Sequence, residues 1–248
     1  NGPVRNHGAT SLMVVMLSDT EIADLYAWLY TDLPTPKGMW DHVFPVDGAY
    51  AVVKRINGID YVLFRGSVST IDWLEDFFKV AVPIPDFYLG HVHPGFVLSI
   101  RAIQDRLNSV LGDHVVIVGH SLGAGHAQIF AGLRVVKNLP VDKIVLFGSP
   151  RAGGPTLSGV LSKLKIISYR NAEPKGHDLV TDIPVAFPPV INYQHPVVLT
   201  DIFAEPDIND KWLVFKYHHF GLYCRALKAN GQAAKSLPGY LLKDTNNG

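Results

Sequence analysis

The sequence predicts an α/β fold in which a mixed, mostly parallel central sheet is covered by helices on both faces. Three observations carry this prediction. Strand-like and helix-like apolar runs alternate over residues 95–170, and an Asn-Gly pair joins two β-rich runs nearer the N-terminus. No repeat, low-complexity tract or linker divides the 248 residues. We therefore expect a single domain over residues 1–248.

The N-terminal part is expected to form a helix and then a hairpin. Ser18 and Glu21 have the spacing of a capping box, and apolar side chains follow at helical spacing over residues 22–29. The run AYAVVKRINGIDYVLFRGS then contains two β-rich segments around Asn57 and Gly58, the strongest short signal for a hairpin turn. The antiparallel part of the sheet is therefore predicted here.

The central part alternates between strands and helices. Helices are predicted over residues 95–111 and 122–137, and strands over 114–118, 143–147 and 166–170. Because short connections in this order bring the strands side by side in the same direction, this part of the sheet is expected to be parallel.

The composition excludes several classes of protein. Hydrophobic residues make up 48% and charged residues 18%, which excludes a disordered chain. Lys plus Arg and Asp plus Glu number 22 each, so net charge favours neither nucleic acid nor an anionic membrane as partner. The longest strictly apolar run, Leu12–Leu17, is far shorter than the roughly 20 residues of a membrane span. The lone Cys224 excludes an internal disulfide and a Cys-rich zinc site.

One serine stands at the junction of a predicted strand and a predicted helix. Gly119 to Gly123 read G-H-S-L-G. The run HVVIV precedes them, and the run LGAGHAQIFAGL begins directly after the serine. This is the setting of a nucleophile elbow, in which a tight turn exposes the hydroxyl of Ser121 at the sheet edge. The first N–H of the following helix, that of Leu122, is expected to stabilise the oxyanion of acyl transfer. The pattern predicts an α/β-hydrolase with a nucleophilic serine.

A serine hydroxyl needs a general base, and the base needs an acid that orients it. In α/β hydrolases the acid and then the histidine follow the serine along the chain. The candidate acids are Asp142, Glu173, Asp178, Asp182, Asp201, Glu205, Asp207 and Asp210, and the candidate bases are His126, His177, His195, His218 and His219. Asp178 follows a predicted strand within an apolar context, and His218 and His219 follow the late apolar run WLVF. These three residues are favoured.

Four motifs together resemble the class 3 lipases, the family of the filamentous-fungal triacylglycerol lipases. In order they are FRGS followed by STIDWLEDF, VHPGF, VIVGHSLGAG and FGSPRAG. The resemblance covers roughly residues 20–228, and it implies an α/β-hydrolase that cleaves carboxylic esters of acylglycerols.

The resemblance also implies roles for particular residues. The acid motif D-x-V-P-x-x-P aligns with DLVTDIP, which makes Asp178 the acid, although Thr181 replaces the first proline and leaves Asp182 as a rival. His218 has the spacing of the family's base, and its neighbour His219 stays an alternative. Ser67 is expected to supply an oxyanion-hole N–H beside that of Leu122.

By the same resemblance, residues 69–89 form a lid that opens at a lipid surface. The segment carries Trp73, Phe77 and Phe78 as candidate lid or substrate-binding residues. The alternative is a helix that packs on the core.

Three functional hypotheses follow. The protein is a lipase for long-chain acylglycerols; an esterase for short-chain or feruloyl-type esters, with phospholipase A1 activity as a variant on the same fold; or a non-catalytic lipid-binding module.

No cofactor is needed for the chemistry, and His91 and His93 lack a third ligand in sequence for zinc. The expected partner is a lipid or ester substrate, with transient contact with a lipid interface, and the family favours a secreted protein. Oligomeric state stays open.

Overall fold

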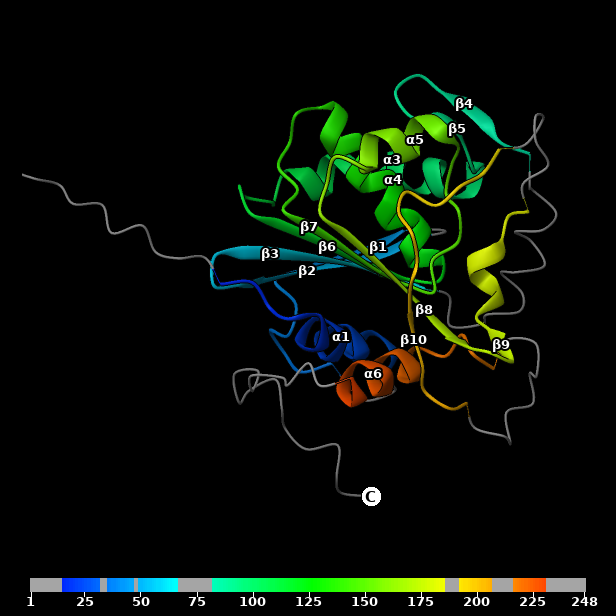
Figure 1. Ribbon diagram of the computed structural model, residues 1–248. Coiled ribbons are helices and arrows are strands. Elements are labelled where there is room, and N and C mark those ends of the chain that lie inside the picture. The colour runs from blue at the N-terminus through cyan, green and yellow to red at the C-terminus, as the bar shows by residue number, and fades with distance from the viewer. Residues whose placement is uncertain are drawn as a thin grey trace, which may run out of the picture.

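A central sheet with helices on both faces organises the part of the chain that the structure describes (Figure 1). The computed structural model describes residues 15–31, 35–46, 49–66, 82–185, 192–206 and 216–230. Within these residues, no helix is long and apolar enough to cross a membrane.

The sheet is mixed and mostly parallel, as predicted. Its strands are β1 (His42–Val46), β2 (Ala49–Ile56), β3 (Ile59–Arg65), β6 (Val115–His120), β7 (Lys143–Phe147), β8 (Ile166–Glu173) and β10 (Thr200–Ile202), in the spatial order β1-β2-β3-β6-β7-β8-β10. The pairs β1–β2 and β2–β3 are antiparallel, and the remaining neighbours in this order are parallel. The short strand β9 (Gly176–His177) adds an antiparallel pair to β8.

The predicted N-terminal helix and hairpin are both present. Helix α1 (Asp19–Ala27) begins at a complete capping box formed by Ser18 and Glu21, and the 3-10 turn η1 (Trp28–Tyr30) continues it. Asn57 and Gly58, with φ values of 53° and 78°, turn the chain between β2 and β3. Two successive residues with positive φ are what a type I′ hairpin turn requires, which is why the sequence signal was reliable.

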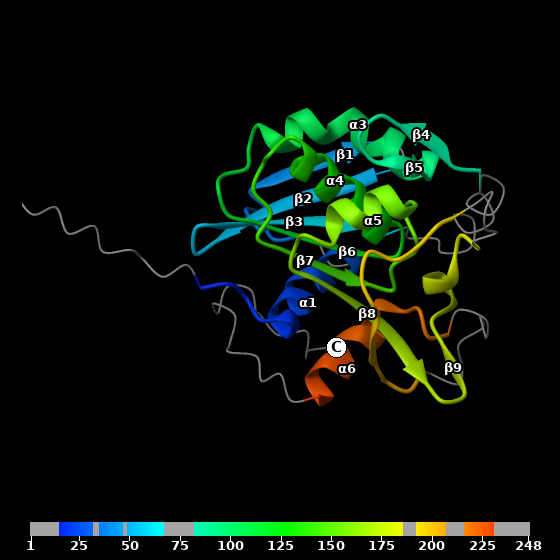
Figure 2. The ribbon, with the colours of Figure 1, turned by 45° about the horizontal axis from the view of Figure 1, so that its top comes forward.

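Two layers of helices cover the sheet, as Figure 2 shows. Helices α3 (Pro94–Asn108), α4 (Leu122–Val136) and α5 (Pro155–Leu161) lie on one face, and α1 and α6 (Phe220–Ala229) lie on the other. Alternate residues of β6 enter the two cores: Val115 and Ile117 pack with the first layer, and Val116 and Val118 with the second. The strands are apolar on both faces because both faces are covered.

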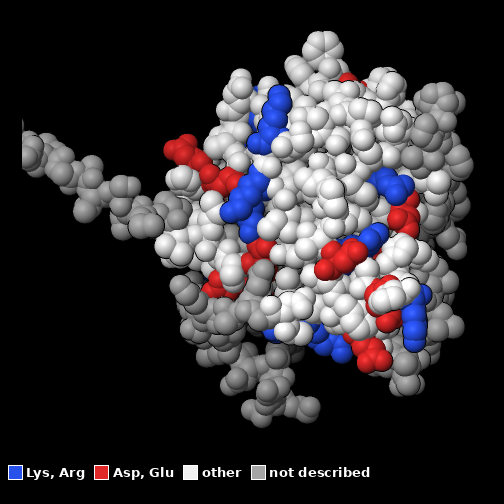
Figure 3. Space-filling view, viewed as in Figure 1, with Lys and Arg blue, Asp and Glu red and all other residues white. Residues whose placement is uncertain are grey.

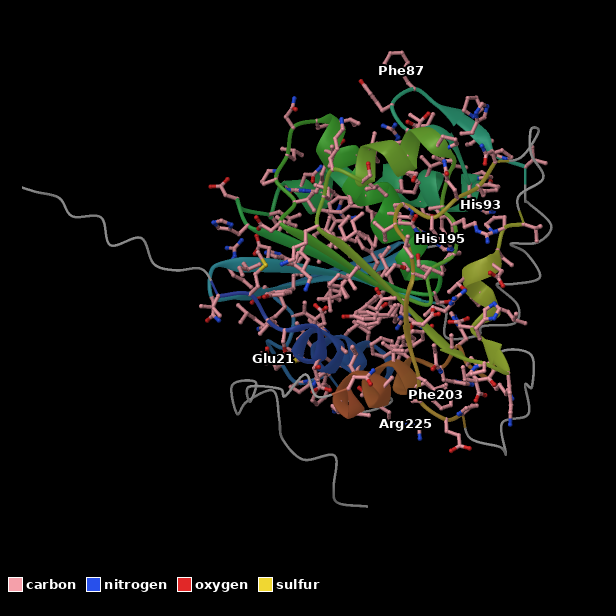
Figure 4. The ribbon with its side chains drawn as sticks, viewed as in Figure 1. Glu21, Phe87, His93, His195, Phe203 and Arg225 are labelled. Atoms are coloured by element: carbon pink, nitrogen blue, oxygen red, sulfur yellow. The ribbon has the colours of Figure 1, made fainter. Side chains whose placement is uncertain are left out.

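A small hairpin outside the main sheet begins within the last residues of the predicted lid segment. Strands β4 (Ile84–Asp86) and β5 (Gly90–Val92) pair antiparallel. The carboxylate of Asp86 accepts the N–H groups of Tyr88 and Leu89 at 2.9 and 3.0 Å and pairs with Arg101 at 2.6 Å, which fixes the turn. Phe87, at the tip, points away from the body of the molecule (Figure 4).

Candidate active site

Ser121 lies at the corner between β6 and α4. Its backbone has φ 57° and ψ −130°, in a region that residues other than glycine rarely adopt. Its N–H donates to the carbonyl of Phe147 at the end of β7, with a distance of 3.1 Å. Such a conformation costs about 1–3 kcal/mol and persists only where the surroundings impose it. The local structure is that of a nucleophile elbow.

Two close backbone contacts explain the glycines on either side of Ser121. A Cβ atom at Gly119 would lie 2.3 Å from the carbonyl oxygen of Gly123. One at Gly123 would lie 1.8 Å from the carbonyl oxygen of Phe64 in β3. Both obstacles are backbone atoms, which cannot move aside as a side chain can. The G-x-S-x-G spacing therefore reflects the close approach of α4 to β6 and β3.

Replacing Gly123 with alanine is expected to lower the free energy of unfolding by about 3 kcal/mol or more, the upper range for an overpacked core, because the added methyl group meets the β3 backbone. Denaturant unfolding measures the loss. Gly159→Ala in α5 is the matched control, since nothing lies within 4 Å of its added Cβ, and it should stabilise the protein by up to about 1 kcal/mol. Equal stability of the two variants would contradict the close packing of α4 on β3.

Asp178 is a buried carboxylate that follows β9. It is the N-cap of the 3-10 turn η2 (Leu179–Asp182), and its Oδ1 accepts the N–H of Val180 at 2.9 Å. Thr181, which replaces the motif proline, donates its hydroxyl to the carbonyl of Asp178 at 2.7 Å and so closes the same turn. The threonine that departs from the motif therefore supports the turn that begins at Asp178. The rival Asp182 pairs with His177 at 2.6 Å.

His218, and not His219, is in contact with Asp178. Its Nδ1 lies 2.7 Å from Asp178 Oδ2, and both side chains are buried. His219 is exposed at the start of α6. Because an ionised carboxylate can only accept, Nδ1 carries the proton and Nε2 of His218 keeps its lone pair. This Nε2 atom is buried and has no hydrogen-bond partner among the described residues, Ser121 included.

The end of β7 brings the serine and the histidine–aspartate pair to one edge of the sheet. The carbonyl of Phe147 accepts the N–H of Ser121. The next residue, Gly148, is in close contact with Asp178 and His218. A Cβ atom at Gly148 would lie 2.5 Å from Asp178 Oδ2 and 2.9 Å from His218 Nδ1. A side chain here would displace the pair.

Tyr223 of α6 adds a contact that sequence reasoning missed. Its hydroxyl donates to Asp178 Oδ2 and accepts the N–H of Asn171 at 3.3 Å. Burial, followed by the negative charge of Asp178, raises the pKa of Tyr223 well above 10. Tyr223 therefore stays protonated and acts as a donor to the carboxylate. The sequence gave no sign of this contact, which joins residues 45 apart.

The other candidate histidines lie elsewhere. His126 is fully buried within α4, and burial lowers its pKa to about 3. His195, labelled in Figure 4, donates from Nε2 to the carbonyl of Thr181 at 2.7 Å, so it supports the η2 turn. His91 is exposed, and His93 is buried and caps α3 by accepting the N–H of Gly95 at 3.2 Å. The described residues contain no group of three or more His, Cys, Asp or Glu side chains arranged to hold a metal.

Of the two predicted oxyanion donors, the structure describes one. Leu122 is the first residue of α4, where backbone N–H groups have no partner within the helix. Ser67 lies outside the described residues, but Gly66, immediately before it in the sequence, lies beside Ser121. A Cβ atom at Gly66 would be 3.1 Å from the Cβ of Ser121. The described part of the chain therefore ends, at Gly66, next to Ser121.

Most of the predicted lid also lies outside the described residues, including Trp73, Phe77 and Phe78. Its last part, residues 82–89, contains β4 and the turn of the small hairpin. Leu89 is buried in the main core, and Asp86 is paired with Arg101. This end of the predicted lid is therefore anchored to the body of the protein.

The sheet order and the strand–serine–helix corner define an α/β-hydrolase. A solved mono- and diacylglycerol lipase from Aspergillus oryzae has the same fold, with a TM-score of 0.57 and 21% identity over 77% of this chain and 82% of that chain. The family model for class 3 lipases matches residues 61–187. The chain belongs to the class 3 lipase family.

Two curated relatives give the extent of the sequence similarity. The lipase of Rhizomucor miehei is 29% identical over 138 residues, covering 51% of this chain and 38% of that lipase. The secreted mono- and diacylglycerol lipase A of Penicillium cyclopium is 31% identical over 119 residues, covering 44% of this chain and 38% of the relative. The match thus spans well under half of each relative.

Proposed function

We propose that this protein hydrolyses carboxylic ester bonds of acylglycerols through Ser121, His218 and Asp178. The observation that carries the proposal is the buried His218–Asp178 pair, which lies at the end of β7 directly beside the elbow of Ser121. Membership of the class 3 lipase family and the names of the two curated relatives support an acylglycerol as substrate.

The proposed reaction has two acyl-transfer steps. His218 Nε2 takes the proton of the Ser121 hydroxyl as Oγ attacks the ester carbonyl, and the imidazolium then protonates the leaving alcohol. The N–H groups of Leu122 and Ser67 stabilise the negative oxygen. Water, deprotonated by His218, then cleaves the acyl-enzyme and releases the acid. Asp178 stays ionised and holds the Nδ1–H tautomer. Before substrate binds, His218 Nε2 has no hydrogen bond to Ser121, which is usual for such sites because the bond forms only in the substrate complex.

The charge distribution is consistent with an uncharged substrate. On the face shown in Figure 3, the described Lys and Arg side chains are interspersed with Asp and Glu, and no patch of one sign dominates. Equal totals of 22 basic and 22 acidic residues agree with this. Charge therefore supplies no long-range attraction for an anionic partner. Since one relative is named as secreted, we propose the same location for this protein.

Substrate class is tested with p-nitrophenyl esters from acetate to palmitate, each measured below and above the concentration at which it aggregates. The lipase proposal expects activity to persist with long acyl chains and to rise when the substrate aggregates. A preference for acetate without any rise would instead identify a short-chain esterase. Lipid binding without turnover of any ester would identify a non-catalytic module and overturn the proposal. Assays with feruloyl esters and phospholipids separate the remaining activities.

A further inference from the structure

A chain of buried and partly buried hydrogen bonds joins three parts of the site. The hydroxyl of Tyr30, at the end of η1, accepts the N–H of Gly66 at 3.1 Å. The same hydroxyl lies 2.8 Å from Nδ1 of His120, the residue before the nucleophile. His120 Nε2 in turn lies 2.9 Å from the backbone carbonyl of His218. The segment entering Ser67, the elbow and the base are thus linked through two side chains.

The direction of each hydrogen bond in this chain is fixed. A carbonyl can only accept, so His120 Nε2 carries a proton and donates to His218. Burial, together with the nearby charge of His218, holds the pKa of His120 well below 6.5, so the ring is neutral and its Nδ1 accepts. Tyr30 therefore donates to Nδ1, and burial raises the pKa of Tyr30 above its usual value. Each group donates to the next, from Gly66 to Tyr30 to His120 to His218.

Packing reinforces the same arrangement. The rings of His120 and His218 are stacked, with centroids 4.7 Å apart and planes inclined by 24°. The backbone N–H of His120 donates to the hydroxyl of Tyr26 at 3.0 Å, and this hydroxyl donates to the carbonyl of Phe64. His120 is therefore held to both β3 and α1. Its neutral ring lies against the ring of His218, which becomes charged during the proposed reaction.

We propose that Tyr30 and His120 are positioning residues that couple the placement of His218 to that of the segment entering Ser67. The inference rests on the proposed function, since it concerns the base and oxyanion donor of that reaction. A displacement of about 1 Å at a catalytic group can cost on the order of 100-fold in rate. Breaking any bond in the chain would release two parts of the site at once, because polarised chains of hydrogen bonds support one another.

The test measures kcat and KM separately for Tyr30→Phe and His120→Phe, with p-nitrophenyl butyrate below its aggregation concentration. His120→Phe keeps a flat ring against His218 but loses both hydrogen bonds. Each variant is expected to lower kcat by about 10- to 100-fold with little change in KM, as for lost orientation rather than lost binding. The double variant should be little worse than either single one, because both break the same chain. His120→Gln, which keeps a donor, should recover part of the rate.

Tyr61→Phe is the matched control. Tyr61 is fully buried on the same face of the sheet, and its hydroxyl accepts the N–H of Leu17 at 2.8 Å, away from the site. This variant should lower Tm about as much as Tyr30→Phe while leaving kcat unchanged. A normal kcat in Tyr30→Phe, or additive losses in the double variant, would overturn the coupling. If Tyr30→Phe does not fold, the kcat values of His120→Phe and His120→Gln test the coupling instead. Ser121→Ala is assayed alongside. If it loses activity while Tyr30→Phe stays normal, the coupling is wrong but the proposed reaction stands; if Ser121→Ala stays active, the proposed reaction itself is wrong.

Discussion

Ser121→Ala is expected to reduce kcat for ester hydrolysis by about 10⁶-fold, the loss typical of removing the nucleophile of a triad. The elbow places this hydroxyl at the sheet edge, and no other group of the site can form the acyl-enzyme in its place. Alanine shares the penalty of serine for positive φ, so thermal stability should stay close to that of the wild type. Initial rates at saturating p-nitrophenyl butyrate, with Tm from circular dichroism, provide both measurements.

Ser109→Ala is a suitable control for this variant. Ser109 is exposed at the end of α3, and its hydroxyl donates to the carbonyl of Arg106 at 2.8 Å. Its removal should leave kcat unchanged. Substantial hydrolysis by Ser121→Ala at the wild-type level of folding would refute the proposed mechanism altogether.

His218→Ala is expected to lower kcat by about 10⁶-fold, whereas His219→Ala should leave it nearly unchanged. The two variants are a matched test and control, because His218 is buried against Asp178 and the adjacent His219 is exposed at the start of α6. Without the imidazole, the Ser121 hydroxyl has no base and the leaving alcohol has no acid. The comparison requires only initial rates of the two variants under the same conditions.

The reverse result, a large loss in His219→Ala alone, would assign the base to the neighbouring residue and contradict the contact seen with Asp178. Equal large losses would show that both side chains are needed. In either case the proposed pairing of His218 with Asp178 would have to be abandoned or extended.

The sequence predicted those elements whose signals are local. The capping box at Ser18 and the Asn57-Gly58 turn each satisfy backbone groups within a few residues, and both appear as predicted. Strand β7 matches its predicted bounds of 143–147 because both its faces are covered, so its apolar run is continuous.

The elements that were missed depend on distant partners. Strand β1 contains Pro45, which disfavours a strand except at an edge, and β1 pairs only with β2 among the described strands. Pro83 directly precedes the β4–β5 hairpin, Pro85 lies within β4, and Arg101 of α3 holds the turn. Helix α6 is stabilised by its packing against α1, near the other end of the chain.

The same distinction applies to the site. The elbow motif predicts the place of Ser121, because strand, turn and helix are contiguous in the sequence. The contact of His218 with Asp178 joins residues 40 apart, and only folding shows which of the two histidines faces inward. Nothing in the sequence indicated that the hydroxyls of Tyr26 and Tyr30 reach the backbone at the end of β3, because those contacts join residues 36 and 38 apart.

The region that resembles the family and the region that builds the site do not coincide. The family model matches residues 61–187, which contain Ser121 and Asp178. His218 lies just before α6, Tyr223 lies within α6 and Tyr30 lies in η1, all outside that region. Helix α6 covers the opposite face of the sheet from α4. A fragment cut to the recognisable region would hold the proposed nucleophile and acid without the proposed base. A chimera that exchanges only that region between relatives would therefore work only where the flanking segments of the host supply a matching histidine.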